Sequence, residues 1–514
     1  MKIWAQWVAI SALFAGCSTQ KEKEVKRPNV IYILADDMGF GDIEACNTAS
    51  KIKTPNLNKI AQEGALFTDM HSSSAVCTPT RYGIITGRYN WRSNLKNGVT
   101  WGESKALIDS SRTTVADLFK RRGYHTAYIG KWHLGWDWGM NSNNEIDFTK
   151  PITNNPNDLG FDYAYGHAAS LDIPPYVYVE NGKATAIPKE KIDGTKGYGF
   201  YRKGWIAPDF KIEEATPNFF NRAKKYIAER ASKKESFFLY LPIPSPHTPI
   251  VPTKEWQGKS GLNPYGDFVM MIDHYVGDLV AELKKQGIDD NTMIIFTSDN
   301  GCSPMARYDV LKAKGHDPSA NYRGHKADIF EGGHHIPFIV RWPAMIKPNT
   351  KVDQISCTTD FMATVADILQ LKMQDNEGED SYSMMPILMG DDSDHYQRDY
   401  TIHHSINGSF AIRKGDWKLE LCAGSGGWSA PRPKKAKEMN LPDVQLYNIA
   451  TDPQETTNVY REHAQVVKDL YGQLIECIDN GRSTQGVKQK NDEGYKGWNQ
   501  RKKLNDLKTE ITNL

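Results

Sequence analysis

The sequence predicts an α/β fold in which a large, mixed but mostly parallel central sheet carries helices on both faces, followed by a smaller C-terminal antiparallel subdomain. Over the first 390 residues, strand and helix patterns alternate, with connections long enough for crossovers. Several of the strands are continuous apolar runs, as expected for buried parallel strands. From about residue 395, short strands separated by turns replace this alternation. Hydrophobic residues form 39% of the 514 residues, enough for a large core.

The first elements show how these predictions arise. The strand at 29–35 is apolar throughout and leads into two aspartates. A helix at 54–64 begins at a Thr-Pro pair and ends at a glycine. The helix at 113–122 has Thr114 as a capping residue and Gly123 as its stop signal.

The remaining elements continue this order to the C-terminus. Those of the central sheet are strand 124–129, helix 214–230, strand 237–241, helix 268–285, strands 292–297 and 337–342, and helix 359–371. Those of the C-terminal subdomain are strands 410–413, 415–421 and 444–447 and a closing helix at 463–478. We therefore expect a large domain at 28–390 that could carry a catalytic site, the antiparallel subdomain at 391–486, and a poorly ordered polar tail at 487–514.

The N-terminus predicts export. Lys2 precedes an apolar run at 3–15, which is too short to span a bilayer and has the length of a signal-peptide core. The Ala-Gly-Cys sequence that ends at Cys17 is similar to a bacterial lipoprotein processing site. We expect residues 1–16 to be removed, Cys17 to be lipidated, and 17–27 to form a tether to the cell envelope, in the periplasm or at the outer membrane. An ordinary secretory signal is the alternative.

Charge and cysteine content exclude other classes. The chain has 63 basic and 62 acidic residues, a net charge of +1, so we expect no nucleic-acid partner. Later segments are too polar to span a membrane, so contact with a membrane would come only through the lipid. The seven cysteines contain no C-x-x-C pair, which disfavours structural zinc. Disulfides among five of them stay open: Cys46, Cys302, Cys357, Cys422 and Cys477.

Oxygen-bearing side chains follow two of the predicted buried strands. Asp36 and Asp37 end the first, and Asp299 and Asn300 follow the strand at 292–297. Because the carboxyl ends of parallel strands share one edge of a sheet, these four side chains can meet there. They would suit a hard cation, Ca²⁺ or Mg²⁺. The alternative is that each pair caps the next helix or turn.

A second pattern is Cys-Thr-Pro-Thr-Arg at 77–81. The proline forces a turn and can open a helix, whose N-terminus attracts anions. Arg81 would lie one turn beyond Cys77 on the same side. A lone cysteine is usually a packed core residue, but the C-x-P-x-R spacing favours a functional role.

With Thr-Gly-Arg at 86–88, this stretch resembles the signature of the type I sulfatases, the formylglycine-dependent arylsulfatase family. Three further stretches resemble the other motifs of the family: GKWHLG at 130–135, PHTP at 246–249, and RGHK at 323–326 leading to EGG at 331–333. The resemblance covers roughly residues 28–450. It implies the alkaline-phosphatase-like fold of that family, a sandwich around a mixed sheet, and sulfate ester hydrolysis.

The resemblance also implies cofactors and roles. A sulfatase-maturating enzyme would oxidise Cys77 to formylglycine (3-oxoalanine), whose hydrate is the nucleophile. One Ca²⁺ would be held by Asp36, Asp37, Asp299, Asn300 and the modified Cys77. The remaining roles are Arg81 for holding the hydrate, Lys131, His247 and Lys326 for binding sulfate oxygens, and His133 for taking a proton so that sulfate is released. Whether His247 or Lys326 protonates the leaving alcohol stays open.

Substrate choice must come from loops on the same edge. The loop 165–176 offers His167, Ser170 and Asp172 among aromatic residues, which suits a carbohydrate. Trp91 and Arg92 are further sugar-binding candidates. The stretches at 91–92 and 170–172 are similar to bacterial relatives of N-acetylgalactosamine-6-sulfatase. That likeness implies exo-acting hydrolysis of galactose- or N-acetylgalactosamine-type 6-O-sulfate ahead of 4-O-sulfate. The alternative is that the loop residues only pack.

Two other functions remain open. A phosphoesterase or phosphonate monoester hydrolase would share the scaffold, and a non-catalytic glycan-binding lipoprotein would share the envelope location. Among other histidines, His334 and His335 are predicted to be structural. Whether His403 and His404 reach the pocket from the C-terminal subdomain stays open.

Overall fold

The computed structural model describes residues 27–390 and 396–514. The predictions for the signal peptide and Cys17 lie outside the described residues. Within that part of the chain, no helix combines the length and apolar character needed to cross a bilayer. The six cysteines it describes are all free, so it contains no disulfide among them.

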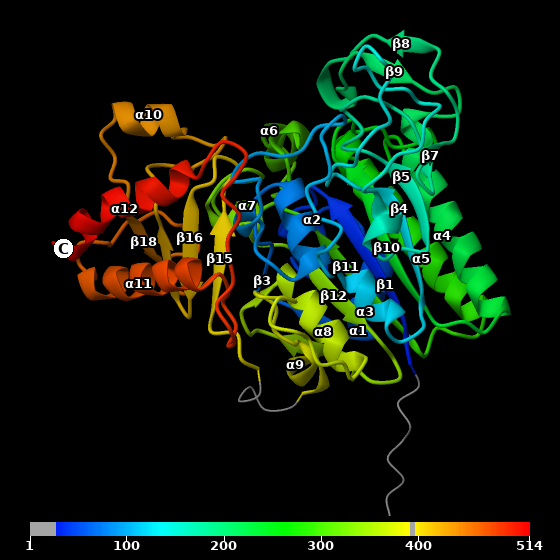
Figure 1. Cartoon of the computed structure of the whole chain (residues 1–514). Helices are drawn as coiled ribbons and strands as arrows, with labels where there is room; N and C mark the ends of the chain where they lie inside the picture. Colours follow the sequence, from blue (N-terminus) through cyan, green and yellow to red (C-terminus); the bar gives the residue numbers. More distant parts are fainter. Residues whose placement is uncertain (1–26, 391–395) are drawn as a thin grey trace, which may run out of the picture.

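A ten-stranded sheet forms the centre of the molecule (Figure 1). Five neighbouring strands in the order β11-β1-β10-β4-β5 run parallel, whereas β12 and β6 pair antiparallel at either side. This confirms the predicted mixed, mostly parallel sheet. In spatial order the strands are β13 (Thr350–Val352), β2 (Ala65–Phe67), β12 (Phe338–Arg341), β11 (Thr292–Ser298), β1 (Asn29–Asp36), β10 (Phe237–Pro246), β4 (His125–Lys131), β5 (Tyr163–His167), β6 (Val179–Glu180) and β7 (Lys183–Ala184).

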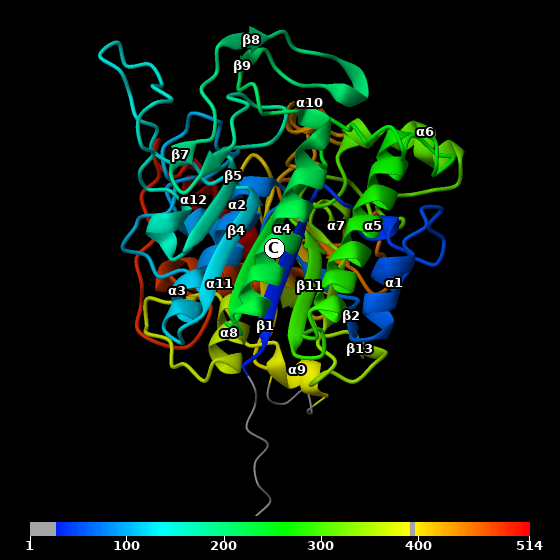
Figure 2. The same cartoon turned by 90° about the vertical axis from the view of Figure 1, so that its right-hand side faces the viewer.

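Helices cover both faces of this sheet because successive residues of a strand point to opposite sides. In β1, Tyr32 and Leu34 join the hydrophobic core beneath α2 (Cys77–Thr86), α3 (Val115–Lys120) and α8 (Phe361–Ile368). Ile31 and Ile33 join the opposite core beneath α1 (Pro55–Gln62), α4 (Ala215–Ser232) and α5 (Pro264–Lys285). Figure 2 shows α4 and α5 lying across the front of the sheet. The predicted cap of α3 is confirmed, since the Thr114 side chain accepts a hydrogen bond from the Asp117 amide.

Shorter elements complete this part of the chain. They are β3 (Met70–His71) with β14 (Ser356–Cys357), the hairpin of β8 (Glu190–Ile192) and β9 (Gly204–Ile206), α6 (Tyr308–Ala313), α7 (Glu331–His334) and α9 (Met385–Met389).

The C-terminal part is a four-stranded antiparallel sheet with covering helices. Its elements are β15 (Tyr400–His404), β16 (Phe410–Lys414), β17 (Trp417–Glu420), β18 (Gln445–Asn448), α10 (Pro433–Glu438), α11 (Ala464–Asn480) and α12 (Asn499–Thr512). This confirms the predicted antiparallel sheet but adds β15, α10 and α12 to the predicted elements.

The expectation of a poorly ordered tail after residue 486 is wrong, because α12 is a packed helix. Leu504, Leu507 and Ile511 are buried in the core that α11 and the four-stranded sheet share. The hydroxyl of Tyr471 in α11 donates a hydrogen bond to the carbonyl of Leu504 (2.7 Å). Spacings of three and four residues place these apolar side chains on one helical face, although the segment as a whole is polar.

Candidate active site

The carboxyl ends of β1 and β11 bring the four predicted metal ligands together. The two strands are parallel neighbours, with Ala35 opposite Ser298. Asp36 ends β1, and Asp299 follows β11 directly. The Asp37 amide donates to Asp299 Oδ1 (3.2 Å) and the Asn300 amide nitrogen to Asp37 Oδ1 (2.7 Å). Strand pairing alone therefore places these side chains at one edge of the sheet.

Three oxygens of this group are buried and lack a hydrogen-bond partner among the described residues. They are Asp36 Oδ1, Asp37 Oδ2 and Asn300 Oδ1. Buried oxygens of this kind are almost always satisfied in folded proteins, so these need an additional partner. Carboxylate and amide oxygens are the ligands that Ca²⁺ and Mg²⁺ prefer. The residues present therefore fit a hard divalent cation, with Cys77 and His247 close enough to join the group.

Cys77 is the first residue of α2 and is buried beside these oxygens. Its Sγ lies 3.5 Å from Lys326 Nζ. Burial raises the pKa of the Cys77 thiol to about 12, although Lys131 and Lys326 oppose this shift. The thiol is thus protonated at neutral pH and, as a plain cysteine, is a poor nucleophile.

Arg81 lies one turn further along α2, as predicted. Its Nε and Nη2 donate to Asp299 Oδ2 (3.0 and 2.7 Å), and its Nη1 donates to the Lys131 carbonyl (2.9 Å). The guanidinium therefore fixes Asp299 and links β11, α2 and the end of β4. Its geometry makes it a positioning group for the Asp299 carboxylate.

Two buried lysines complete the charge balance. Lys131, at the end of β4, places its Nζ 2.6 Å from Asp36 Oδ2, and Lys326 places its Nζ 2.6 Å from Asp37 Oδ1. Burial raises the pKa of Asp36, but Lys131, with His247 and Arg81, outweighs this effect and holds that pKa below its ordinary value. The site thus contains ionised aspartate beside ammonium groups that can receive an anion.

The hydrogen bonds of His133 define its tautomer. Its Nε2 lies 2.8 Å from the Thr100 carbonyl, which can only accept, so Nε2 carries the proton. Burial, with the charges of Lys131 and Arg81, holds the pKa of His133 well below its ordinary value. Nδ1 is buried with no partner in the part of the chain that the structure describes. His133 is therefore neutral, with a free lone pair on Nδ1.

His247 follows β10, between β1 and β4 in the sheet. Its Nδ1 lies 2.6 Å from the Thr248 carbonyl and therefore donates. Its Nε2 lies 3.6 Å from Asp37 Oδ2. Nε2 is thus the atom of this ring that faces the Asp37 carboxylate.

Of the three candidates in the substrate loop, Asp172 lies beside His247. Its Oδ1 is 3.9 Å from His247 Nδ1 and has no hydrogen-bond partner within the described residues. Ser170 is buried in the same loop. His167 pairs with Lys131 on the neighbouring strand, and its ring stacks on Phe219, so its contacts are mainly packing contacts. Burial lowers the pKa of His167 to about 3 and keeps it neutral.

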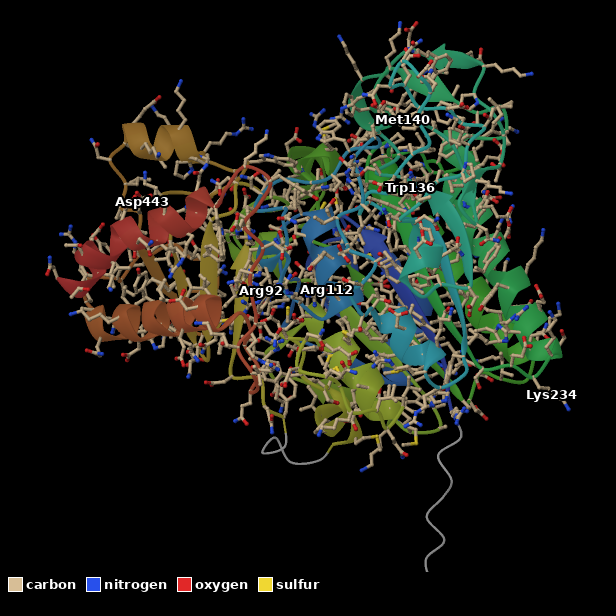
Figure 3. All side chains as sticks on the ribbon, in the orientation of Figure 1. Arg92, Arg112, Trp136, Met140, Lys234 and Asp443 are labelled. Carbon is tan, nitrogen blue, oxygen red and sulfur yellow. The ribbon has the colours of Figure 1, made fainter. Side chains whose placement is uncertain are left out.

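The prediction that Trp91 and Arg92 bind sugar is wrong. Both are fully buried, Trp91 in the core of the C-terminal subdomain and Arg92 at the junction with that subdomain (Figure 3). The Trp91 ring stacks between Tyr89 and Trp498, and Arg92 forms two hydrogen bonds with Asp380. An indole enclosed by protein rings cannot stack on a sugar, so the stretch holds the two parts of the chain together.

The four other candidate histidines, His334, His335, His403 and His404, also belong to the interior. His335 contacts Glu331 and the Thr68 carbonyl, His403 the Ser72 carbonyl, and His404 the Asn90 amide. His334 and His403 stack face to face (3.8 Å, 6°) beside His71. Lone pairs in two parallel ring planes cannot converge on one ion, so this histidine group is structural.

Two residues near the site carried no signal in the sequence. Thr100 binds His133 through its carbonyl, which any residue type could supply. Arg202 pairs with Asp172 across 30 residues of sequence and lies in no recognisable motif. Only the folded loop brings them to the site.

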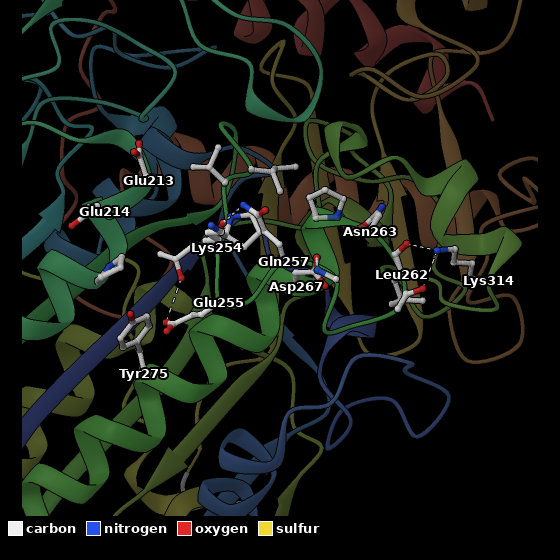
Figure 4. A pocket seen from close by; sticks show the side chains of 18 residues that line it. Glu213, Glu214, Lys254, Glu255, Gln257, Leu262, Asn263, Asp267, Tyr275 and Lys314 are labelled. Carbon is white, nitrogen blue, oxygen red and sulfur yellow. Dashed lines mark hydrogen bonds between the residues drawn. The ribbon is translucent and has the colours of Figure 1, made fainter.

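A groove of about 1440 Å³ adjoins the loop that follows His247 (Figure 4). Its walls are the loop that follows His247 and the start of α5. None of the residues proposed as ligands or catalysts lines it. The chemistry is therefore placed at the edge of the sheet rather than in this groove.

Known proteins resemble the chain over most of its length. A family model described as Sulfatase matches residues 28–371. N-acetylgalactosamine-6-O-sulfatase of Bacteroides thetaiotaomicron is 34% identical, covering 91% of this chain and 97% of that protein. N-acetylgalactosamine-6-sulfatase of Rattus norvegicus is 28% identical, covering 78% and 72%. A solved structure connected with glycosaminoglycan metabolism by B. thetaiotaomicron has a TM-score of 0.77 and 32% identity, covering 88% of this chain and 99% of that one.

Proposed function

The chain belongs to the sulfatase family, and from that premise we propose that it hydrolyses sulfate esters of glycans with a formylglycine formed from Cys77 and one Ca²⁺. The observation that carries this proposal is the position of Cys77: its sulfur lies 3.5 Å from Lys326 Nζ and within 4.8 Å of ligand atoms of Asp36, Asp37 and His247. The protonated thiol gives a reason for modification, because an unmodified Cys77 would be a poor nucleophile at neutral pH.

The side chains of Asp36, Asp37, Asp299 and Asn300 would hold the Ca²⁺. Bound there, the ion would supply positive charge to a sulfate oxygen and help to orient the ester. Lys131 and Lys326 would donate hydrogen bonds to the other sulfate oxygens and stabilise the charge that develops as the ester bond breaks. Arg81 would keep Asp299 in place.

Proton transfer is proposed for two histidines. The free Nδ1 lone pair of His133 makes it the base that removes a proton from the modified residue 77. His247 Nε2 faces the ligands and, when it carries a proton, can give that proton to the leaving alcohol. Lys326 is the alternative acid, and its ion pair with Asp37 favours retention of its proton.

For the substrate, we propose an exo-acting preference for galactose- or N-acetylgalactosamine-type 6-O-sulfate over 4-O-sulfate. Support comes from the two relatives named for N-acetylgalactosamine 6-sulfate. The unpartnered Asp172 Oδ1 beside His247 would accept a hydrogen bond from a sugar hydroxyl. We further propose export, lipid attachment at Cys17, and a maturating enzyme as partner.

The test is mass spectrometry of the peptide that contains residue 77, purified from the native host. Formylglycine is lighter than cysteine, so a mass loss at this peptide together with sulfatase turnover supports the proposal. An unmodified thiol in every preparation would instead favour the glycan-binding lipoprotein. Comparing matched aryl sulfate and aryl phosphate tests the phosphoesterase alternative, and the proposal expects the sulfate to react faster.

A further inference from the structure

A segment with excess positive charge lies over the same edge of the sheet. We call residues 187–206, which contain the β8–β9 hairpin, the basic flap. In Figures 1 and 2, β1 rises from the N-terminal end of the described chain, and β8 and β9 lie above the end it points to. The flap therefore overhangs the carboxyl ends of the parallel strands, where the proposed catalytic residues lie.

Hydrogen bonds attach the basic flap to both loops beside His247. The Ile250 amide, three residues after His247, donates to the Tyr198 carbonyl of the flap (2.8 Å). The Arg202 amide of the flap donates to the Asp172 carbonyl (3.1 Å). The flap is thus held against the site from two sides.

Arg202 links the basic flap to the site through Asp172. Its Nη1 pairs with Asp172 Oδ2, and the other oxygen of that carboxylate lies 3.9 Å from His247 Nδ1. The Arg202 side chain is 38% exposed, and within the described chain its Nε and Nη2 make no hydrogen bond. One edge of the guanidinium is fixed and the other faces outward.

An exposed indole lies beside this guanidinium. The Arg202 carbon Cζ is 5.1 Å from the ring centre of Trp101, whose exposed fraction is 52%. Trp101 directly follows Thr100, whose carbonyl holds His133. An exposed tryptophan with a cation at its face, next to a proposed catalytic loop, has the composition of a sugar-binding platform.

Charge distinguishes the basic flap from the groove lined by the loop that follows His247. The flap has five basic residues against two acidic ones: Lys189, Lys191, Lys196, Arg202 and Lys203 against Glu190 and Asp193. The groove has four acidic residues against two basic ones: Glu213, Glu214, Glu255 and Asp267 against Lys254 and Lys314. A negatively charged chain is therefore attracted to the flap and repelled from the groove.

We propose that the basic flap, with Arg202 and Trp101 at its base, binds an anionic sugar next to the sugar whose sulfate is removed. Arg202 pairs with a carboxylate or second sulfate on that neighbour, and Trp101 packs against its ring. The preferred substrate is then an anionic oligosaccharide rather than a free monosaccharide. This inference rests on the proposed sulfatase function.

Binding can be measured without turnover in the Cys77→Ser protein. The probes are a disaccharide of 6-sulfated N-acetylgalactosamine and a uronic acid, the same disaccharide with its carboxyl group reduced to an alcohol, and one with a second sulfate on the neighbouring sugar. Adding Arg202→Gln should weaken binding of the two probes whose neighbouring sugar is anionic by about tenfold. Binding of the probe with the reduced carboxyl group should weaken much less. The carboxylate and second-sulfate probes show which anion is preferred.

Two further variants provide a second test of the proposed site and a control for charge. Trp101→Ala changes an exposed side chain and should weaken all three disaccharides. Lys234→Gln removes one exposed positive charge at the opposite end of the sheet (Figure 3) and should change none of these affinities. Equal losses for charged and reduced probes in Arg202→Gln, or no loss in either variant, would overturn the inference. Absence of turnover by the matured wild type on every sulfate ester would instead contradict the proposed function.

Discussion

Two buried groups of charges in this protein differ in what they leave unsatisfied. The proposed catalytic cluster (Asp36, Asp37, Asp299, Asn300 and the cations around them) lies at the edge of the ten-stranded sheet. The junction cluster (Arg92, Asp360, Asp380 and Arg398) lies between the two parts of the chain. Each consists of fully buried aspartates that pair with basic side chains.

In the junction cluster, protein atoms satisfy the carboxylates. Asp380 Oδ2 accepts from Arg92 Nε (2.7 Å) and the Tyr89 amide (2.8 Å), and Oδ1 accepts from Arg92 Nη2 (2.9 Å) and the Ser483 amide (2.9 Å). In the catalytic cluster, three oxygens have no such partner. Burial and charge do not identify a site by themselves, whereas unsatisfied ligand atoms beside a reactive side chain do.

The strongest test of this contrast is Cys77→Ser. Loss of the proposed nucleophile should reduce turnover by a factor of about 10⁴ or more in a host that matures only cysteine. Thermal unfolding should change little, because the substituted side chain donates to no carboxylate. Turnover of aryl sulfate by purified variant and wild type measures the effect. Wild-type turnover by an unmodified serine would contradict the mechanism.

Matched aspartate substitutions compare the two clusters directly. Asp380→Asn leaves Arg92 buried beside a neutral group, which should cost about 3–5 kcal/mol of unfolding free energy. Activity per folded molecule should remain. Without metal, Asp37→Asn should lower the free energy of unfolding by less than Asp380→Asn does. Asp37 and Asp36 repel each other, since the charge of Asp37 raises the pKa of Asp36.

Activity should respond in the opposite order. Asp37→Asn should lower kcat/KM by about 10²–10³, because the proposed Ca²⁺ site loses a negatively charged ligand. Denaturant unfolding in chelator and steady-state turnover of both variants check the pair. Equal stability losses with equal activity losses would remove the distinction between the clusters.

His247→Ala tests which catalytic residues act on the leaving group. If His247 protonates the alcohol, its loss should slow sugar sulfates about 10²–10³-fold and activated aryl sulfates much less. The measurement is the ratio of kcat values on the two substrates for variant and wild type. Equal losses would transfer the acid role to Lys326.

The sequence predicted that most residues of the proposed catalytic cluster would meet, because they lie in short motifs at strand ends, where one parallel sheet brings them together. It failed for Arg92 because a motif does not show whether a guanidinium already has a carboxylate partner, and Asp380 is 288 residues away. Arg202 was missed for the same reason, since its position depends on how the basic flap folds. The helix α12 was missed because three apolar residues in a polar segment are a weak signal.

The smallest effect should be a pH dependence at the junction. His404 accepts a hydrogen bond from the Asn90 amide nitrogen, and burial, with Lys96, lowers its pKa to about 3. Near pH 7 it is neutral in folded and unfolded states alike. Between about pH 6.5 and 3 only the unfolded state binds the proton, so this residue removes about 1.4 kcal/mol of stability per pH unit as pH falls. His404→Gln should therefore unfold with a shallower loss of stability from pH 6.5 to 5 than wild type, as measured by denaturant midpoints. Parallel curves would mean that His404 is protonated in the folded protein and that the junction cluster tolerates an added positive charge.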